Sequence, residues 1–62
     1  MKKLIREDIN LETKCSYSIY RVGHSRSDFR FYVYECDPDG NQTFIGDFTE
    51  DEALALVREK CR

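Results

Sequence analysis

The stretch CDPDGNQTFIGDFTEDEALALVREKCR, residues 36–62, contains a turn, a strand and a capped helix in close succession. The helix has the clearest signals. Thr49 is an N-cap residue and Glu52 follows three positions later, which is the pattern of a capping box. Acidic side chains occupy residues 50–52, at the positive end of the helix dipole, and basic side chains occur near its negative end. The sequence therefore predicts a helix that begins after Thr49 and continues almost to the end of the chain.

One side of this predicted helix is apolar. At about 100° per residue, its apolar side chains fall within an arc of about 160°. A helix of about twelve residues is only marginally stable alone in water, so we expect this arc to pack on another apolar surface. The arc consists of Ala53, Leu54, Leu56, Val57 and Cys61.

A sheet is predicted immediately before the helix. The residues Asp37-Pro38-Asp39-Gly40 form a strong turn signal, because Pro38 presets φ and Gly40 accepts a positive φ. The alternating stretches on either side, FRFYVYEC at 29–36 and QTFIGDF at 42–48, are predicted to be the strands of a hairpin. YSIYRV, residues 17–22, is predicted as a third strand, joined to the hairpin by the polar loop 23–28.

The predicted fold class is α+β, with a three-stranded antiparallel β-meander packed against one C-terminal α-helix in the order β-β-β-α. Residues 1–14 are predicted to add a short N-terminal strand or an extended arm. Residues 1–62 together are expected to form a single small domain.

Alternation divides the strand at 29–36 into two sides. One side is apolar and suited to contact the helix, and the other carries arginine and tyrosine. Tyr20 or Arg21 of the neighbouring strand is expected to join the second side. The apolar set is Phe29, Phe31 and Val33, and the second set is Arg30, Tyr32 and Tyr34.

The hairpin register decides whether Phe44 and Phe48 join the apolar side. We expect that they do, because burying two phenylalanine side chains is worth about 1.5–3 kcal/mol each. A three-residue loop at 38–40 would instead pair Asp37 with Asn41 and turn both phenylalanines to the other side. A four-residue loop, or a bulge near Gly46, would restore them. The expected pairs are Val33 with Phe44, Phe31 with Gly46 and Phe29 with Phe48, and they place Arg30 across from Asp47.

The composition excludes several classes of protein. The chain is 40% apolar and 35% charged, with a net charge of -2 and eight aromatic residues, which is typical of a folded domain rather than a disordered chain. No apolar run approaches the roughly 20 residues that span a membrane, and no apolar segment follows the basic start as in a signal peptide. We therefore expect a cytoplasmic protein without membrane association.

Catalytic and metal-binding patterns are weak. His24 lies beside two serines in a polar loop, where no oxyanion hole or enclosed pocket is expected, so it is interpreted as a solvated side chain. Asp37 and Asp39 resemble the start of a calcium loop, but the spacing of Gly40 and the absence of the later glutamate do not fit. We expect no enzyme activity, cofactor, metal or small-molecule substrate. The cysteines Cys15, Cys36 and Cys61 fit neither a disulfide framework nor a zinc site and are interpreted as partly buried apolar residues.

The candidate site is the arginine and tyrosine side of the sheet. Tyrosine and arginine are enriched in protein interfaces, and they also stack on bases and contact phosphate. Covering by the N-terminal arm or by a second copy of the chain is a third alternative. Residues 14–34 carry a net charge of +3 but residues 35–52 carry -7, which would repel phosphate and favours a protein partner. The candidate binding residues are Arg21, Arg26, Arg30, Tyr32 and Tyr34.

Residues 28–54, DFRFYVYECDPDGNQTFIGDFTEDEAL, resemble the strand-turn-strand-helix of the AP2 and integrase arm-type DNA-binding modules. The resemblance implies a sheet that enters the major groove, with Arg21, Arg26, Arg30 and Tyr32 as the contacts. This chain departs from that family in its acidic charge and its lack of tryptophan. The matching pattern falls on Phe29, Phe31, Gly40, Gly46, Phe48, Thr49, Glu52 and Ala53.

A second similarity is to HicB-like antitoxins, whose strand-to-helix junction resembles GDFTEDEA at residues 46–53. The function expected from the sequence is a non-catalytic binding module for a protein partner or for self-association. Such a module would be an accessory, antitoxin or inhibitor protein of a phage or mobile element. The alternative is a nucleic-acid-binding module that uses the same side of the sheet.

Overall fold

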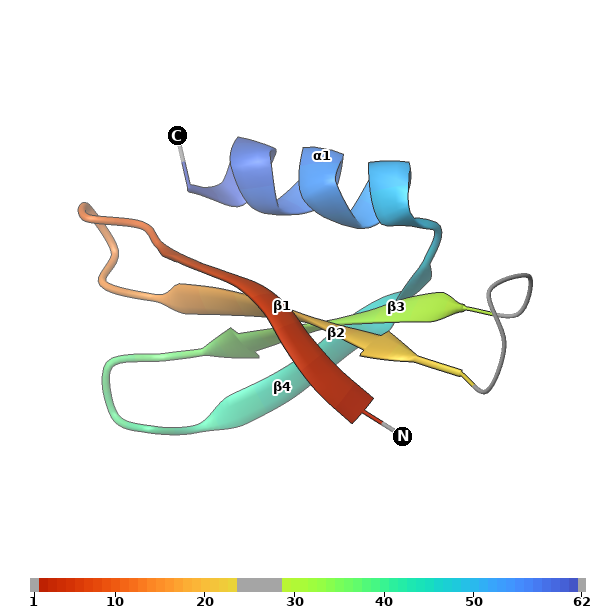
Figure 1. The fold of residues 1–62 in the computed structure, drawn as a ribbon. Coiled ribbons are helices and arrows are strands. Elements are labelled where there is room, and N and C mark those ends of the chain that lie inside the picture. Colours follow the sequence, from red (N-terminus) through yellow and green to blue (C-terminus); the bar gives the residue numbers. More distant parts are fainter. Residues whose placement is uncertain (1, 24–28, 62) are drawn as a thin grey trace.

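The chain forms a sheet with a helix across one face in the computed structural model, which describes residues 2–23 and 29–61 (Figure 1). Neighbouring strands are antiparallel and follow the order β1-β2-β3-β4. The α+β class and the C-terminal helix are confirmed, whereas the prediction of three strands is wrong. The elements are β1 (Lys2–Ile9), β2 (Ser16–Val22), β3 (Arg30–Cys36), β4 (Gln42–Phe48) and α1 (Glu50–Lys60).

The additional strand is β1, which occupies the stretch expected to be a short strand or an arm. It pairs with β2 along its length, and a bulge at Ile5 interrupts the register between Leu4 and Arg6. The extra residue breaks the two-residue alternation of side chains by which a strand is recognised in a sequence. Helix α1 packs against β2, β3 and β4, so β1 lies at an exposed edge where alternating burial is not required.

The turn between β1 and β2 is built around Asn10. Its Oδ1 accepts hydrogen bonds from the backbone N–H groups of Glu12 at 2.8 Å and Thr13 at 3.0 Å. Lys14 closes the turn with a left-handed φ of 67°. The Asn10 Nδ2 group donates to the carbonyl oxygen of Lys60 at 2.6 Å, which satisfies one of the acceptors left free at the end of α1. The turn between β1 and β2 is thus fastened to the C-terminal end of α1.

The turn between β3 and β4 has the three-residue loop 38–40. The N–H of Asp37 donates to the carbonyl of Asn41 at 2.9 Å, and the Asp37 side chain accepts from the N–H groups of Asp39 and Asn41. Gly40 has a φ of 92°, which favours glycine. The hydrogen bonds of this turn therefore set the register at this end of the hairpin, and the register expected from the burial of both phenylalanines does not form here.

A bulge at Ile45 then shifts the pairing of β4 by one residue. The bulge returns Gly46 and Phe48 to the side that faces the helix but leaves Phe44 on the other side, so the prediction that both phenylalanines share the helix side is wrong for Phe44. One inserted residue satisfies both the turn and Phe48, so the expectation that a bulge near Gly46 would return the phenylalanines to the helix side is confirmed for Phe48. The observed pairs are Phe31 with Phe48, Val33 with Gly46 and Tyr34 with Phe44.

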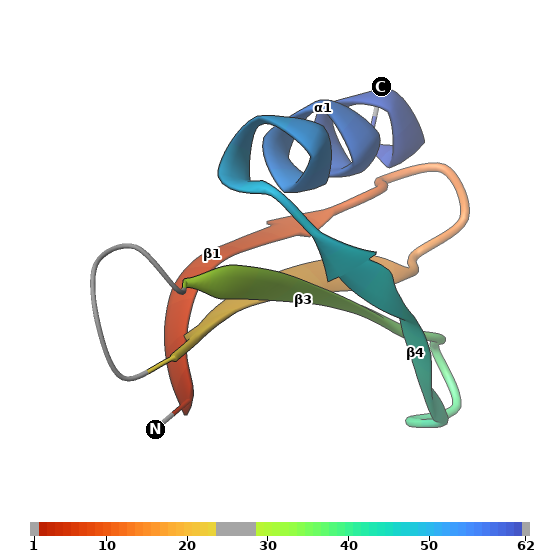
Figure 2. The same ribbon diagram turned by 90° about the vertical axis from the view of Figure 1, so that its right-hand side faces the viewer.

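The core lies between the sheet and α1, as predicted, and Figure 2 shows the helix above the two central strands. The capping box is present: the Thr49 hydroxyl accepts from the Glu52 N–H, and the Glu52 carboxylate accepts from the Thr49 N–H at 3.0 Å. The predicted helix arc is confirmed, since all of its residues contact the core. The buried core residues are Tyr17, Ile19, Phe31, Val33, Ala53 and Val57.

Candidate functional site

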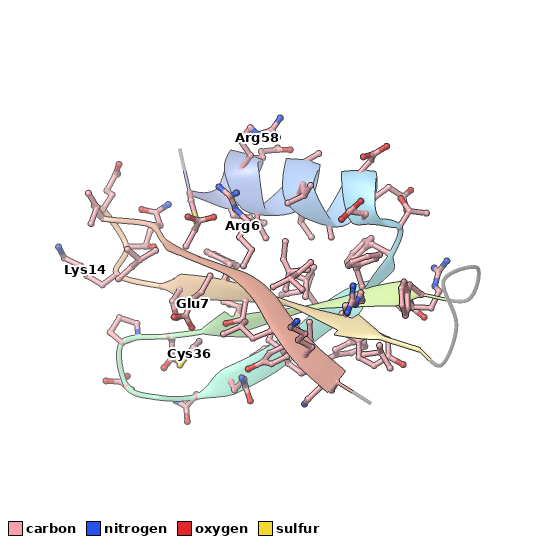
Figure 3. All side chains as sticks on the ribbon, viewed as in Figure 1. Arg6, Glu7, Lys14, Cys36 and Arg58 are labelled. Atoms are coloured by element: carbon pink, nitrogen blue, oxygen red, sulfur yellow. The ribbon has the colours of Figure 1, made fainter. Side chains whose placement is uncertain are left out.

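The sheet has two faces with different environments. The inner face packs against α1, and the outer face is turned away from it. Figure 3 shows the alternation on β1, where Arg6 extends toward α1 while Glu7 lies on the opposite side with Cys36. The pairing of the strands places these residues on the outer face: Lys2, Leu4, Glu7 and Ile9 of β1, Ser16, Ser18, Tyr20 and Val22 of β2, Arg30, Tyr32, Tyr34 and Cys36 of β3, and Gln42, Phe44 and Asp47 of β4.

Four aromatic rings meet in the middle of the outer face. We call them the aromatic cluster: Tyr20, Tyr32, Tyr34 and Phe44. The rings of Tyr20 and Tyr34 are 5.5 Å apart and nearly perpendicular, at 86°. Phe44 lies 5.3 Å from both Tyr32 and Tyr34. The Tyr20–Tyr34 and Tyr32–Phe44 pairs are edge-to-face, and the Tyr34–Phe44 pair is tilted. Edge-to-face pairs of aromatic rings are favourable. Phe44 is nevertheless 51% exposed, so part of its ring is open to solvent, while the three tyrosines are half-buried.

Charged groups on the outer face are balanced around the aromatic cluster. The Lys2 ammonium lies 4.8 Å from the centre of the Tyr20 ring and 5.3 Å from that of Tyr34. Arg30 Nε donates to Asp47 Oδ1 at 2.7 Å. Glu7 contributes a second carboxylate at the β1 side of the face. Among the described strand residues of the outer face, two positive and two negative side chains therefore cancel.

The structure brings together three of the five predicted site residues. Arg30, Tyr32 and Tyr34 lie side by side on the outer face, and the predicted approach of Arg30 to Asp47 is confirmed although Asp47 pairs with Tyr32 in the register. Arg21 lies on the inner face, where its guanidinium stacks 4.5 Å from the ring of Phe29. Arg26, like His24, Ser25 and Ser27, lies outside the described residues.

Sequence reasoning missed several residues of the outer face. Phe44 could have been found, because the turn at residues 37–41 predicts the register that turns it outward. No pattern in the sequence placed Lys2 and Leu4 on this face, because the bulge at Ile5 interrupts the alternation that shows which side chains of β1 share a face. Tyr20 was one of two candidates from the neighbouring strand, and its contact with Tyr34 selects it over Arg21.

The inner face contains a partly buried polar pair beside the core. The hydroxyl of Tyr17 donates to Glu35 Oε2 at 2.6 Å, and only 5% of Tyr17 is exposed. The hydrogen bond to Glu35, followed by burial, raises the pKa of Tyr17 from 10.0 to about 12. This pair is remote from the aromatic cluster, because β2 and β3 present Tyr17 and Glu35 on the side that packs toward α1.

We expect the Tyr17–Glu35 pair to make the free energy of unfolding depend on pH in the alkaline range. The pKa of Tyr17 is higher in the folded state than in the unfolded chain. The hydrogen bond to Glu35 therefore contributes fully to the free energy of unfolding below about pH 10, and this contribution is lost as the pH rises toward 12. Urea unfolding of the protein and of Tyr17→Phe, at about pH 8 and about pH 11, measures this contribution. The difference in free energy of unfolding between the two proteins should shrink at the higher pH. An unchanged difference would contradict the assignment.

The cysteines are free and half-buried, as expected for small apolar side chains. Cys15 and Cys61 both pack against the core cluster. No group of three or more histidine, cysteine or acidic side chains within residues 2–23 and 29–61 is arranged to hold a metal ion. Over the same residues, no helix has the length and apolar character needed to cross a membrane.

Comparison of the chain with protein-family models, with curated proteins and with solved structures finds no match.

Proposed function

We propose that this protein is a non-catalytic binding module whose outer face binds a protein partner. The observation that carries the proposal is the uncovered aromatic cluster, in which a half-exposed Phe44 lies between the rings of Tyr32 and Tyr34. Exposed apolar patches on folded domains, when they are large, often mark surfaces that contact another molecule. An accessory, antitoxin or inhibitor protein of a phage or mobile element would use such a face.

The distribution of charge supports a protein partner. Protein interfaces typically have an aromatic centre with few charges and a polar rim. Here the rings of Tyr32, Tyr34 and Phe44 form the centre, and the ion pair of Arg30 with Asp47 lies beside them. Tyrosine contributes disproportionately to binding energy because it supplies a large rigid surface and a polar group.

The edges of the sheet are poorly suited to bind a partner by strand addition. Both edge strands contain a bulge, at Ile5 in β1 and at Ile45 in β4. In addition, β1 begins with Lys2 and Lys3. Bulges and edge lysines disfavour pairing with another strand, so the face rather than an edge is the surface available to a partner.

Nucleic acid is less well supported. A DNA-binding face needs a net positive charge to displace counterions from the phosphates, and the outer face is neutral. Arg21 is on the inner face, and the guanidinium of Arg30 is already paired with Asp47. The contacts implied by the AP2 resemblance are therefore not gathered on one surface.

Position-specific photo-cross-linking tests the proposal. A benzophenone amino acid is placed at Phe44 and, as a matched control, at Arg58 on the exposed side of α1. We expect one defined protein adduct, either with another protein or with a second copy of this chain, from position 44 but not from position 58. Tyr34→Ala in the same chain should reduce that adduct, because it removes one of the rings that contact Phe44.

Two results would overturn the proposal. The first is the same adducts, or none, from both positions. The second is salt-dependent binding of labelled single-stranded or duplex DNA that is lost in the double variant Arg30→Ala, Tyr32→Ala. The second result would assign the outer face to nucleic acid instead.

A further inference from the structure

We infer that Tyr20 and Tyr34 form a binding site for a lysine side chain of the protein partner, and that Lys2 of this chain occupies the site in its absence. This inference rests on the proposed function and names the partner's chemistry. The two rings meet at 86° with centres 5.5 Å apart, so they form a corner with two aromatic walls. The Lys2 ammonium lies within 6 Å of both ring centres, which is the range of a cation–π contact.

A carboxylate lies on the same face as this aromatic corner, with β2 between it and Tyr34. Glu7 and Ser18 are directly paired across β1 and β2, and the Ser18 hydroxyl donates to Glu7 Oε2 at 3.2 Å. Ser18 in turn pairs with Tyr34 across β2 and β3. The two ring faces favour a positive group at short range, and the Glu7 carboxylate elsewhere on the outer face adds attraction at longer range.

Lys2 is a replaceable occupant. It lies at the start of edge strand β1 and is exposed. Its ammonium contacts the rings, but no ion pair within 4.0 Å joins Lys2 to an acidic group of the described residues. An exposed cation–π contact is weak, so a lysine presented by a partner on a larger interface can displace Lys2. Lys2 then acts as an internal competitor that lowers the affinity for the partner.

Titration with a lysine analogue tests the site directly. The probe is Nα-acetyl-lysine methylamide, and its neutral counterpart is Nα-acetyl-norleucine methylamide, which has the same chain without the ammonium. Binding is followed by NMR from the ring protons of Tyr20 and Tyr34. We expect Lys2→Gln to bind the lysine probe about two- to fivefold more tightly than the unmodified chain, the ratio that one exposed cation–π contact supplies.

Lys3→Gln is the matched control, because Lys3 pairs with Arg21 and so points to the opposite face. It makes the same change of charge and should bind the probe as the unmodified chain does. Adding Tyr34→Leu to Lys2→Gln should abolish the ring shifts by removing one wall of the corner. Equal shifts from the lysine and norleucine probes, or equal affinities of Lys2→Gln and Lys3→Gln, would overturn the inference.

The two proposals fail independently. A lysine probe that does not bind, together with a specific adduct from position 44, removes the lysine site but leaves the protein-binding face. If the lysine probe binds as expected but position 44 gives no specific adduct, the proposed protein partner is contradicted. Tyr20 and Tyr34 then remain as a site for a cation alone.

Discussion

Replacing Ile19 by alanine is expected to leave much of the protein unfolded at room temperature. Ile19 is 0% exposed, pairs with Val33 in the centre of the sheet and belongs to the core beneath α1. Removing a buried isoleucine side chain costs about 2–5 kcal/mol, because apolar burial is lost and a cavity remains. A core of this size rarely supplies more than about 3–5 kcal/mol in total, so this loss approaches the whole stability of the domain.

The measurement is urea unfolding followed by far-UV circular dichroism. Ile9→Ala is the matched control, since it makes the same change on the outer face, where Ile9 is 49% exposed. Its free energy of unfolding should stay within about 0.5 kcal/mol of the unmodified chain. Similar losses in the two variants would contradict the assignment of the core to the space between the sheet and α1.

Replacing Gly46 by alanine is expected to lower the free energy of unfolding by about 1–2 kcal/mol. A Cβ at this position would lie 2.8 Å from Cζ and 2.9 Å from Cε2 of the Phe48 ring, which is closer than these atoms can approach. Displacing the half-buried Phe48 from the core costs about 1–3 kcal/mol, and the lower flexibility of alanine in the unfolded chain offsets about 0.5–1 kcal/mol of this.

A double-mutant cycle with Phe48→Leu isolates the cause. Leucine lacks the Cε and Cζ atoms that a Cβ on residue 46 would meet, so Gly46→Ala should be neutral or slightly stabilising in that background. Chemical unfolding of the four proteins measures the coupling. An equal cost of Gly46→Ala with phenylalanine or leucine at residue 48 would show that the backbone, rather than the ring, requires glycine.

The helix was predicted well because its signals are local. The capping box of Thr49 and Glu52 and the apolar arc need only a few neighbouring residues to act, and both occur where expected. The division of β3 into an inner side with Phe31 and an outer side with Tyr32 was equally predictable. Alternation follows from strand geometry alone and does not depend on the partner strand.

The candidate site was predictable only in part, because it is shared among four strands. Arg30, Tyr32 and Tyr34 came from one strand and were identified by alternation. Tyr20, Phe44 and Lys2 join them through the registers of three pairs of strands. A shift of one residue moves a whole strand segment to the opposite face, so the assignments of Lys2 and Phe44 depend on the bulge in β1 and on the turn before β4.

By itself, the sequence determined the capped helix, the turn at residues 37–41 and the two sides of β3, because each depends on side chains close together in the chain. Only the tertiary structure decided that residues 2–9 form a strand, that Phe44 faces outward and that Lys2 meets the tyrosine rings. The physical reason is that these outcomes depend on the register between neighbouring strands, and a bulge in β1 or β4 shifts that register without a local signal in the sequence.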